Sequence, residues 1–495
     1  MSPREYDVLP RASTLAQLPS EYPTDAQDLI ARHLEDGTKP KKSLLIALDD
    51  DPTGTQTCHD IIVLTVWDVP TLVEEFQRPG SRGLFILTNS RALPPIEAEK
   101  LIRAVCENVA QAARTTGQGV EIVLRGDSTL RGHFPLETDV AQSVFGDVDA
   151  WVLAPFFFQG GRFTINDVHY VAEGEQLVPV ANTPFAKDAT FGYKSSNLRD
   201  YIMEKAPGRF RPEQIFSVTI EDIRRGGPDK VAAKLVDLPR RSIVIVNAAA
   251  ESDMHVFVAG LLQAQSQGKR FLYRTGAAFV STRLGVRSKA LVTASELNLP
   301  APRQTGGLII AGSHVPKTTA QLKVLIDRRG PHLAVLELNV EELISSKENA
   351  AAAVARIVQE AERQLRSGKD TLVMTSRKLI TGDDELSSLA IGTKVAEALG
   401  GITSSDAATK GLNIKRALVV GQAAPGIPLW RCDESTSRHV GVPDPAYITA
   451  PNNKADLAKG RHEYDIVQGV KMGRRSDIDV EAVLAEDRKR MRVWS

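Results

Sequence analysis

Short apolar runs recur along this chain and alternate with stretches of helical periodicity. The runs are rich in Val, Ile and Leu and are bounded by polar residues or glycine, which is typical of strands buried on both faces. Alternation of such strands with helices implies mainly parallel sheets that helices cover on both sides. The sequence therefore predicts an α/β protein. The predicted strands are Leu44–Leu48, Ile61–Val66, Leu84–Thr88, Val120–Leu124, Trp151–Ala154, Ile243–Val246, Leu308–Ala311, Ala334–Leu338, Thr371–Thr375 and Ala417–Val420.

Helical patterns fill the gaps between these strands. Apolar residues recur at helical spacing in Ala98–Val109, and Gly117 ends that pattern. Ser345 and Glu348 have the spacing of a capping box, which predicts the start of a helix that ends at Gly368.

The length of 495 residues exceeds what one hydrophobic core usually supports, so we expect two domains. Prolines and glycines punctuate residues 286–305, where we place the boundary. The predicted parts are an N-terminal arm at 1–40, a first domain at 41–290, a second domain at 305–450 and a tail at 451–495.

Charge and cysteine content narrow the class of protein. The 61 basic residues balance 61 acidic ones, which argues against a nucleic-acid or membrane-surface partner. The three cysteines have no metal-ligand spacing, which favours a reducing compartment. Neither a secretory signal nor a membrane span is evident, so we expect a cytoplasmic protein.

Polar residues follow the strands of the first half, where parallel sheets bind ligands. Asp49, Asp50 and Asp51 come first, and adjacent carboxylates that repel one another usually persist because they bind a cation, a polyol or a proton. A solvated turn with a helix cap is the alternative. Arg91 follows a second strand, and the segment 125–133 follows a third.

The segment 125–133 contains Asp127, Ser128 and Arg131. Arginine matches a carboxylate in a planar, two-pronged way, and aspartate accepts hydrogen bonds from sugar hydroxyls. One pocket could therefore hold a small hydroxylated acid, although an exposed polar loop would also explain the composition. Gly160, Gly161 and Arg162 after the next strand are a weaker signal.

The second half has small and hydroxyl residues at its strand ends. Such residues suit a phosphate, because free backbone N–H groups point outward at a helix N-terminus and glycines let the backbone approach an anion. Paired glycines are also common in ordinary turns, and neither familiar nucleotide fingerprint is present. The candidate residues are Ser313, Thr375, Ser376, Gly400, Gly401, Thr403 and Ser404.

These motifs, in this order, resemble those of the four-carbon acid sugar kinase family. The most specific piece is DSTLRG at 127–132. The other pieces are DDDPTG at 49–54, TNSR at 88–91, APFFFQGGRFT at 154–164, YRTGAAFV at 273–280, GSHVPKTTAQL at 312–322, TSR at 375–377, GGITSSD at 400–406 and PGIP at 425–428.

The resemblance implies a domain that binds a sugar acid and a domain that binds ATP, with the ligand cleft between them. It implies transfer of a phosphate from ATP, with Mg²⁺, to a hydroxyl of an erythronate- or threonate-like acid or a keto derivative. Asp50, Asp51, Arg91, Asp127, Ser128 and Arg131 match the substrate side, and the seven residues of the second half match the nucleotide side. We expect Arg131 and Arg91 to hold the substrate carboxylate and either Asp51 or Asp127 to accept the hydroxyl proton.

Two features depart from the family pattern. A helical segment runs straight into Gly400, where the family has a strand before the glycine pair, so a strand is predicted to be missing. The tail at 451–455 reads PNNKA, where the family has a loop of the type Pro-Gly-Asn-Val-Gly. Loss of both glycines excludes the backbone conformations that only glycine adopts easily.

These departures leave a second hypothesis open, a sugar-acid-binding homologue with a defective ATP site. A third hypothesis, a nicotinamide-dependent sugar-acid dehydrogenase, requires a glycine fingerprint after the first strand, where DDDPTG stands instead. The expected partners are small molecules. Neither a metal ligand set nor the oligomeric state follows from the sequence, and a homodimer stays open.

Overall fold

The structure is a computed structural model that describes residues 4–35, 43–293, 295–297, 306–312, 316–377, 380, 391, 415–424, 427–432 and 446–449. The chain divides into two compact units. The first contains residues 1–291, 384–389 and 419–428, and the second contains residues 292–383, 390–418 and 429–495. This arrangement confirms the predicted α/β class with two domains; the predicted cleft between them stays a prediction.

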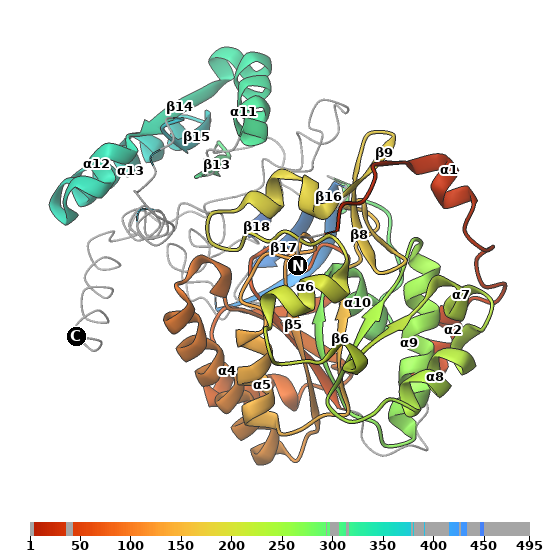
Figure 1. The fold of residues 1–495 in the computed structure, drawn as a ribbon. Helices are drawn as coiled ribbons and strands as arrows, with labels where there is room; N and C mark the ends of the chain where they lie inside the picture. Colours follow the sequence, from red (N-terminus) through yellow and green to blue (C-terminus); the bar gives the residue numbers. More distant parts are fainter. Residues whose placement is uncertain are drawn as a thin grey trace. The chain divides into compact units, whose positions relative to one another are not determined.

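The first unit is built on a large, mostly parallel sheet (Figure 1). All six strands predicted for the first half are present and pair in parallel with their neighbours. The sequence analysis missed β10 and β12, whose mixed residues Ile-Phe-Ser-Val and Phe-Leu-Tyr-Arg-Thr lack the aliphatic pattern. The strand order is β10 (Ile215–Val218), β11 (Ser242–Val246), β6 (Ala150–Ala154), β12 (Phe271–Thr275), β5 (Val120–Arg125), β2 (Leu44–Asp49), β4 (Gly83–Leu87) and β3 (Ile61–Leu64), followed by those parts of β16 (Arg416–Ala424) and β17 (Ile427–Cys432) that lie at 419–428.

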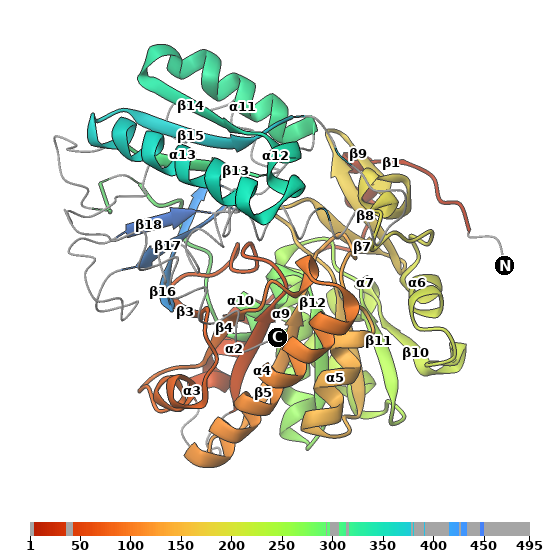
Figure 2. The same cartoon turned by 90° about the vertical axis from the view of Figure 1, so that its left-hand side faces the viewer.

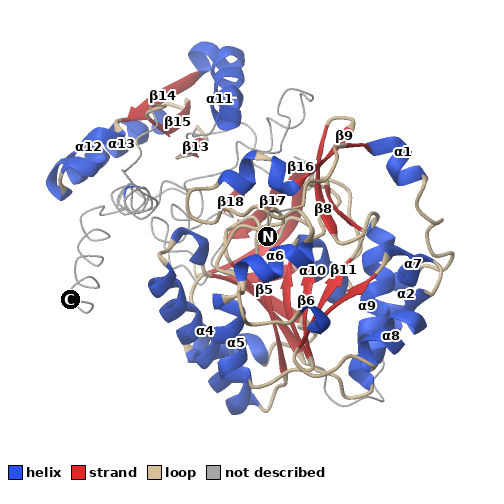
Figure 3. Ribbon diagram, viewed as in Figure 1, coloured by secondary structure: helices blue, strands red, loops and turns tan. Residues whose placement is uncertain are grey.

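Helices cover both faces of this sheet, because alternate residues of its strands point to opposite sides. On one face, Ile46 and Leu48 of β2 pack in a core with side chains of α3 (Val69–Phe76), α4 (Pro95–Thr116) and α5 (Leu136–Phe145). Figure 3 shows α4 and α5 on one side of the strands and the α8–α9 pair on the other. Gly117 ends α4 as predicted, with φ of 63°. The other helices of this unit are α1 (Arg11–Ala16), α2 (Ala26–Glu35), α6 (Leu198–Lys205), α7 (Ile220–Arg224), α8 (Gly227–Val236), α9 (Glu251–Ser266) and α10 (Ala277–Arg283).

A small antiparallel sheet forms the rest of the first unit and was not predicted. Its strand order is β1 (Leu9–Pro10), β9 (Gln176–Pro179), β8 (Val168–Glu173) and β7 (Arg162–Ile165). The stretch predicted as an N-terminal arm thus supplies one strand of this sheet, and Ile30 of α2 is 1% exposed.

Short 3-10 turns complete both units. They are η1 (Ser90–Ala92), η2 (Val180–Asn182), η3 (Pro184–Lys187), η4 (Pro212–Gln214) and η5 (Gly330–His332).

The second unit has a three-stranded parallel sheet in the order β13 (Leu308–Ala311), β15 (Asp370–Thr375) and β14 (Leu333–Leu338). Figure 2 shows this sheet between α11 (Pro316–Arg329) and the pair α12 (Val340–Ser345) and α13 (Lys347–Arg366). Separate apolar clusters lie on its two faces. Further along the chain, β18 (Ala446–Thr449) pairs antiparallel with β17 from Leu429 to Cys432.

The predicted capping box of this unit is wrong by one position. Ser346, not Ser345, is the N-cap of α13, and its side chain accepts a hydrogen bond from the Asn349 N–H at 3.1 Å. Ser345 instead ends α12, a helix of 6 residues that Ser346 separates from the 20 residues of α13.

The predicted absence of a strand before Gly400 concerns residues outside the described part of the chain. No helix in the described part is long and apolar enough to span a membrane.

Candidate functional site

Three consecutive carboxylates lie where β2 ends, as the sequence predicted. The strand is fully buried between β4 and β5, so its exit is central in the sheet. Asp49 is 0% exposed and Asp50 is 3% exposed, whereas the side chain of Asp51 is 21% exposed. Asp51 is held by the N–H and hydroxyl of Thr53, which donate to its Oδ1 at 2.8 and 2.5 Å. Of the three, Asp51 is the carboxylate that solvent can reach.

Arginines from three other strand ends surround these carboxylates. Arg125 Nη1, at the end of β5, lies 3.2 Å from Asp49 Oδ1 and 3.3 Å from Asp51 Oδ1. Arg91 pairs with Asp51 and lies 3.4 Å from Asp50 Oδ1, and Arg274 of β12 lies 3.9 Å from Asp50 Oδ2. Because each carboxylate has a guanidinium neighbour, three adjacent negative charges can be kept in a buried position.

The DSTLRG segment forms a second charged group beside the first. Arg131 Nε donates to Asp127 Oδ2 at 2.7 Å, and Arg131 Nη1 lies 3.5 Å from Asp188 Oδ2. The Thr129 hydroxyl also donates to Asp127. Ser128 is 5% exposed, and its backbone carbonyl accepts from His169 Nε2 at 2.8 Å. The structure thus places all six predicted substrate-side residues in the first unit.

Two glycines of this segment leave room for Arg274. A Cβ on Gly126 would lie 1.3 Å from Arg274 Nη1, and a Cβ on Gly132 would lie 2.7 Å from Arg274 Nη2. Gly132 also has a φ of 123°, which side chains rarely adopt. The glycines of the motif therefore allow a guanidinium to lie against the backbone.

The buried carboxyl groups differ in pKa, because neighbouring charges outweigh the effect of burial at only some of them. Burial raises the pKa of Asp49 to about 7, and the Arg125 charge lowers it only in part. Burial likewise raises the pKa of Glu137, which accepts a hydrogen bond from the Ser90 hydroxyl at 2.5 Å, to about 7. Burial also acts on Asp127, but Arg131, Arg91 and Thr129 outweigh it and hold the pKa of Asp127 well below 3.8. Asp127 therefore stays ionised at neutral pH and is a weak proton acceptor.

The carboxylate cluster could be mistaken for a metal site. Oxygens of Asp49, Asp50 and Asp51 lie within 4.8 Å of one another. However, Arg125 lies within 4.0 Å of all three, so a guanidinium already supplies the positive charge that a divalent cation would bring. This donor set does not fit a dedicated Mg²⁺ cage.

In the second unit, two predicted nucleotide-side residues lie at the carboxyl end of the middle strand. The Thr375 hydroxyl donates to the Gly312 carbonyl at 3.0 Å, and the Ser376 hydroxyl accepts from the Val340 N–H at 3.2 Å. Both hydroxyls thus tie the ends of neighbouring strands together. Ser313, Gly400, Gly401, Thr403 and Ser404 lie outside the described residues, so the nucleotide side stays a prediction.

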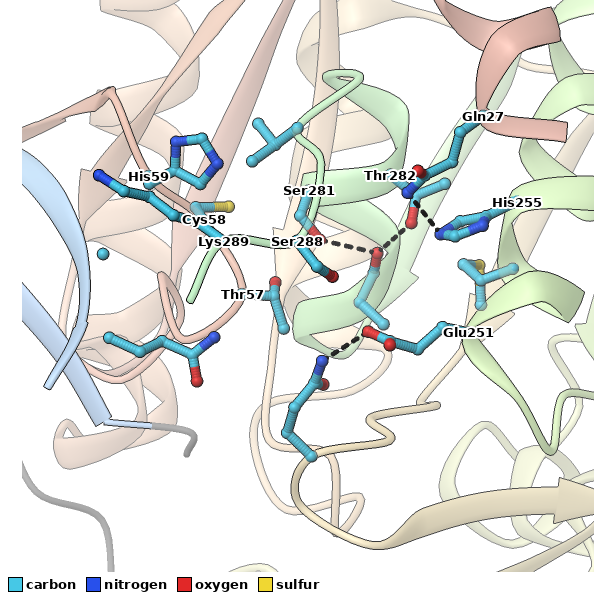
Figure 4. Close-up of a pocket in the computed structure, with 16 residues that line it drawn as sticks. Gln27, Thr57, Cys58, His59, Glu251, His255, Ser281, Thr282, Ser288 and Lys289 are labelled. Carbon is cyan, nitrogen blue, oxygen red and sulfur yellow. Dashed lines mark hydrogen bonds between the residues drawn. The ribbon is translucent and has the colours of Figure 1, made fainter. Parts of the chain in front are cut away.

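The first unit also has a cavity of about 30 Å³ (Figure 4). Its polar lining includes Gln27, which is 3.0 Å from His255 Nε2, and Gln159, which donates to Glu251 at 2.5 Å. None of the predicted site residues lines it. Its volume suits one or two waters and is too small for a sugar acid.

The sequence analysis missed Arg274 and Glu137 as site residues and gave Arg125 no role of its own. Arg125 and Arg274 each lie in or beside a quoted motif at the end of a strand. A rule that charged residues at neighbouring strand ends meet could have found both arginines, had β12 been predicted. Glu137 gave no signal, because it lies in the first turn of α5, where acidic residues are common.

Comparisons with known proteins agree with the division of the chain into two units. A family model of a sugar-binding N-terminal domain matches residues 45–283, and a model of a nucleotide-binding C-terminal domain matches residues 308–400 and 393–451. No curated protein matches the chain.

Solved structures resemble the chain over most of its length. A protein of Salmonella typhimurium LT2, described as a candidate tRNA synthase, has a TM-score of 0.54 and 17% identity over 81% of this chain and 94% of its own. A Haemophilus influenzae protein from a family of domains of unknown function has a TM-score of 0.47 and 18% identity, covering 79% and 93%. A Bordetella bronchiseptica member of that family, a domain-swapped dimer with bound citrate, has a TM-score of 0.38 and 18% identity, covering 82% and 94%. At 17% identity, the likeness to the Salmonella protein shows the fold alone.

Proposed function

Because the chain belongs to the four-carbon acid sugar kinase family, we propose that it transfers the γ-phosphate of ATP to a hydroxyl of a four-carbon sugar acid. The observation that carries the proposal is the charged group at the ends of β2 and β5, with carboxylates and guanidinium groups side by side. A hydroxylated acid needs both kinds of partner, since carboxylates accept from its hydroxyls and guanidinium groups bind its carboxylate.

Asp51 is the preferred proton acceptor of the two that the sequence left open. Its side chain is 21% exposed, so a substrate hydroxyl can reach it. Asp127 accepts hydrogen bonds from Arg131 and Thr129, and its pKa is well below 3.8. It therefore suits hydrogen bonding to substrate hydroxyls better than proton transfer. The transfer itself depends on positioning and on charge stabilisation rather than on a strong base.

ATP and Mg²⁺ are proposed to bind at the second unit. When bound, Mg²⁺ would neutralise phosphate charge, and it usually binds through phosphates and one or two carboxylates. Among the described residues of the second unit, Gly312 and Ser376 lie at the carboxyl ends of β13 and β15, where the phosphates are proposed to bind. The glycine pair at 400–401 and the hydroxyls of Thr403 and Ser404 are proposed to complete the phosphate site.

The test is ADP release from purified protein with ATP, Mg²⁺ and a panel of four-carbon sugar acids. In Arg131→Ala, affinity for the accepted acid should fall about 10- to 150-fold, which is typical for loss of a charge-assisted hydrogen bond. Arg241→Ala is a suitable control, because Arg241 is exposed and pairs only with Asp147 at the surface. Unchanged affinity in Arg131→Ala would remove the basis for placing the acid at this site.

A second candidate function is a sugar-acid-binding homologue without phosphoryl transfer. The match to the nucleotide-binding model comes in two pieces that both contain residues 393–400, where the sequence analysis expects a strand to be missing. This candidate predicts that calorimetry detects sugar-acid binding but no ATP binding at millimolar ATP. Measurable ADP release that depends on the acid would exclude it.

A further inference from the structure

Arg162 has an unusual position for a charged residue. It begins β7 of the small antiparallel sheet and is 2% exposed. Its Nη1 donates to the Gly160 carbonyl at 2.5 Å, and its buried Nε has no hydrogen-bond partner. A buried guanidinium keeps its charge at neutral pH, and burying a charge is costly unless an opposite charge compensates it.

The other buried arginines of the first unit show what is missing at Arg162. Among the described residues, each of them has a carboxylate within 4.0 Å, whereas no carboxylate lies that close to Arg162. The compensated pairs are Arg125–Asp49, Arg224–Asp253, Arg274–Asp50 and Arg283–Glu121. Arg162 therefore differs from these four arginines in that no described carboxylate contacts it, and Asp127 acts on its charge only from a greater distance.

An aromatic ring places Arg162 beside the proposed substrate site. The Cζ atoms of Arg162 and Arg131 lie 5.3 and 5.2 Å from the centroid of the Phe185 ring. Arg131 in turn contacts Asp127 and Asp188. The Arg131 charge acts unfavourably on Arg162, and a further anion in contact with both guanidinium groups would relieve that repulsion.

The charges elsewhere in the site point to the same anion position. Arg91, which the sequence analysis assigned to the substrate carboxylate, is already paired with Asp50 and Asp51. In contrast, no described carboxylate accepts a hydrogen bond from the Nε–H of Arg162. A carboxylate, which accepts two parallel hydrogen bonds, matches the guanidinium geometry.

We infer that Arg162 binds the carboxylate of the substrate acid, with Arg131 on the same ring, and so selects acids over neutral polyols. This inference rests on the proposed function and names the residue that recognises the acid group. The hydroxyl end of the substrate then faces Asp51 and Asp127, where the phosphate is to be added.

The experiment compares wild type, Arg162→Met, Arg162→Lys and the surface control Arg241→Met by calorimetry with erythronate, threonate and erythritol. The Met variant should bind the accepted acid about 10- to 150-fold more weakly, the Lys variant should recover part of this loss, and the control should match wild type. Binding of erythritol should not differ among the four proteins. Equal acid affinity in wild type and Arg162→Met would overturn the inference and leave the proposed function standing.

Thermal unfolding separates this role from a structural one. Without ligand, Arg162→Met should be at least as stable as wild type, because it removes a buried charge that no described carboxylate contacts. A clear loss of stability would indicate a structural residue and contradict the inference. Sodium sulfate, compared with sodium chloride at equal ionic strength, should raise the Tm of wild type more than that of Arg162→Met. If wild type binds neither sugar acid while sulfate still stabilises it through Arg162, the anion site stands and the proposed function fails. If wild type binds neither sugar acid and sulfate stabilises both proteins equally, the inference and the proposed function both fail.

Discussion

Both units are α/β structures, but their strands differ in how completely their residues are buried. In the first unit every residue of β2 is buried, and β5 and β6 are buried almost throughout. In the second unit all four residues of β13 are only half-buried, and Val335 and Val358 are 38% and 39% exposed. Burial of apolar surface is the main favourable term in folding. The comparison predicts that the first unit is rigid and that the second unit has less stability in reserve.

Hydrogen exchange is the sharpest test of this difference and has the largest expected effect. Amides of β13 should exchange about 100-fold faster than those of β2 and β5, which corresponds to about 2.7 kcal/mol of local stability. Half-buried strands open without full unfolding, whereas a strand in the middle of the large sheet does not. Equal protection in the two sheets would break the comparison.

Gly126→Ala tests how tightly the first unit is packed around its charges. The new Cβ would lie 1.3 Å from Arg274 Nη1, so Arg274 must move. Overpacking of this kind typically costs about 1–3 kcal/mol, and we expect a loss of about 2 kcal/mol in the first unit by denaturant unfolding.

A double-mutant cycle provides the control for that variant. Adding Arg274→Ala removes the collision, so the cost of Gly126→Ala should be much smaller in the Arg274→Ala background. Exchange of the amides at 306–377 should stay unchanged in all three variants. Additive effects of the two substitutions would mean that the collision is not the cause.

The pH dependence of stability should differ between the units because the carboxyl groups with raised pKa lie in the first. The folded pKa of Asp49 is about 7, above the ordinary value of 3.8, so the folded state binds more protons between these values. The contribution of Asp49 to the free energy of unfolding is therefore complete at low pH and is lost as pH rises through 7. Asp49→Asn should flatten the fall in Tm between pH 5 and pH 8 by a few degrees relative to wild type.

Asp147→Asn is the matched control for the pH experiment. Hydrogen bonds from Gln142 and Arg241 lower the pKa of this exposed carboxyl group, so its contribution is present at neutral pH and is lost only as pH falls through the lowered value. Between pH 5 and pH 8 this variant should follow wild type. An identical pH profile for wild type and Asp49→Asn would show that Asp49 ionises normally in the folded protein.

Helix caps provide the smallest effect and compare one helix from each unit. Ser346→Ala removes the N-cap of α13. Asp68→Ala removes the N-cap of α3, where the Asp68 carboxylate accepts a hydrogen bond from the Thr71 N–H at 3.0 Å. Each change should cost about 1 kcal/mol. Exchange in α13 should rise about fivefold in Ser346→Ala, whereas α3 is held by the larger core and should show little local change in Asp68→Ala. A larger local effect in α3 than in α13 would contradict the ranking of the two units.

The sequence by itself determined the fold class, the ten predicted strands and the place where polar residues collect. Runs such as Leu44–Leu48 and Leu308–Ala311 became strands because a parallel sheet needs continuous apolar residues, and that need is local in the sequence. The carboxyl ends of such strands meet at one edge, which is why Asp51 and Asp127 could be placed in one unit from motifs alone.

Only the tertiary structure decided how the charges are shared. Arg274 reaches the Arg131 carbonyl across 143 positions of sequence, and no local pattern predicts such a contact. The structure also showed that Arg91 is already paired, whereas Arg162, a weak signal in the sequence, is buried without a carboxylate partner. Compensation of a buried charge depends on which groups the fold brings within about 4 Å, and that information resides in the packing of distant segments rather than in any motif.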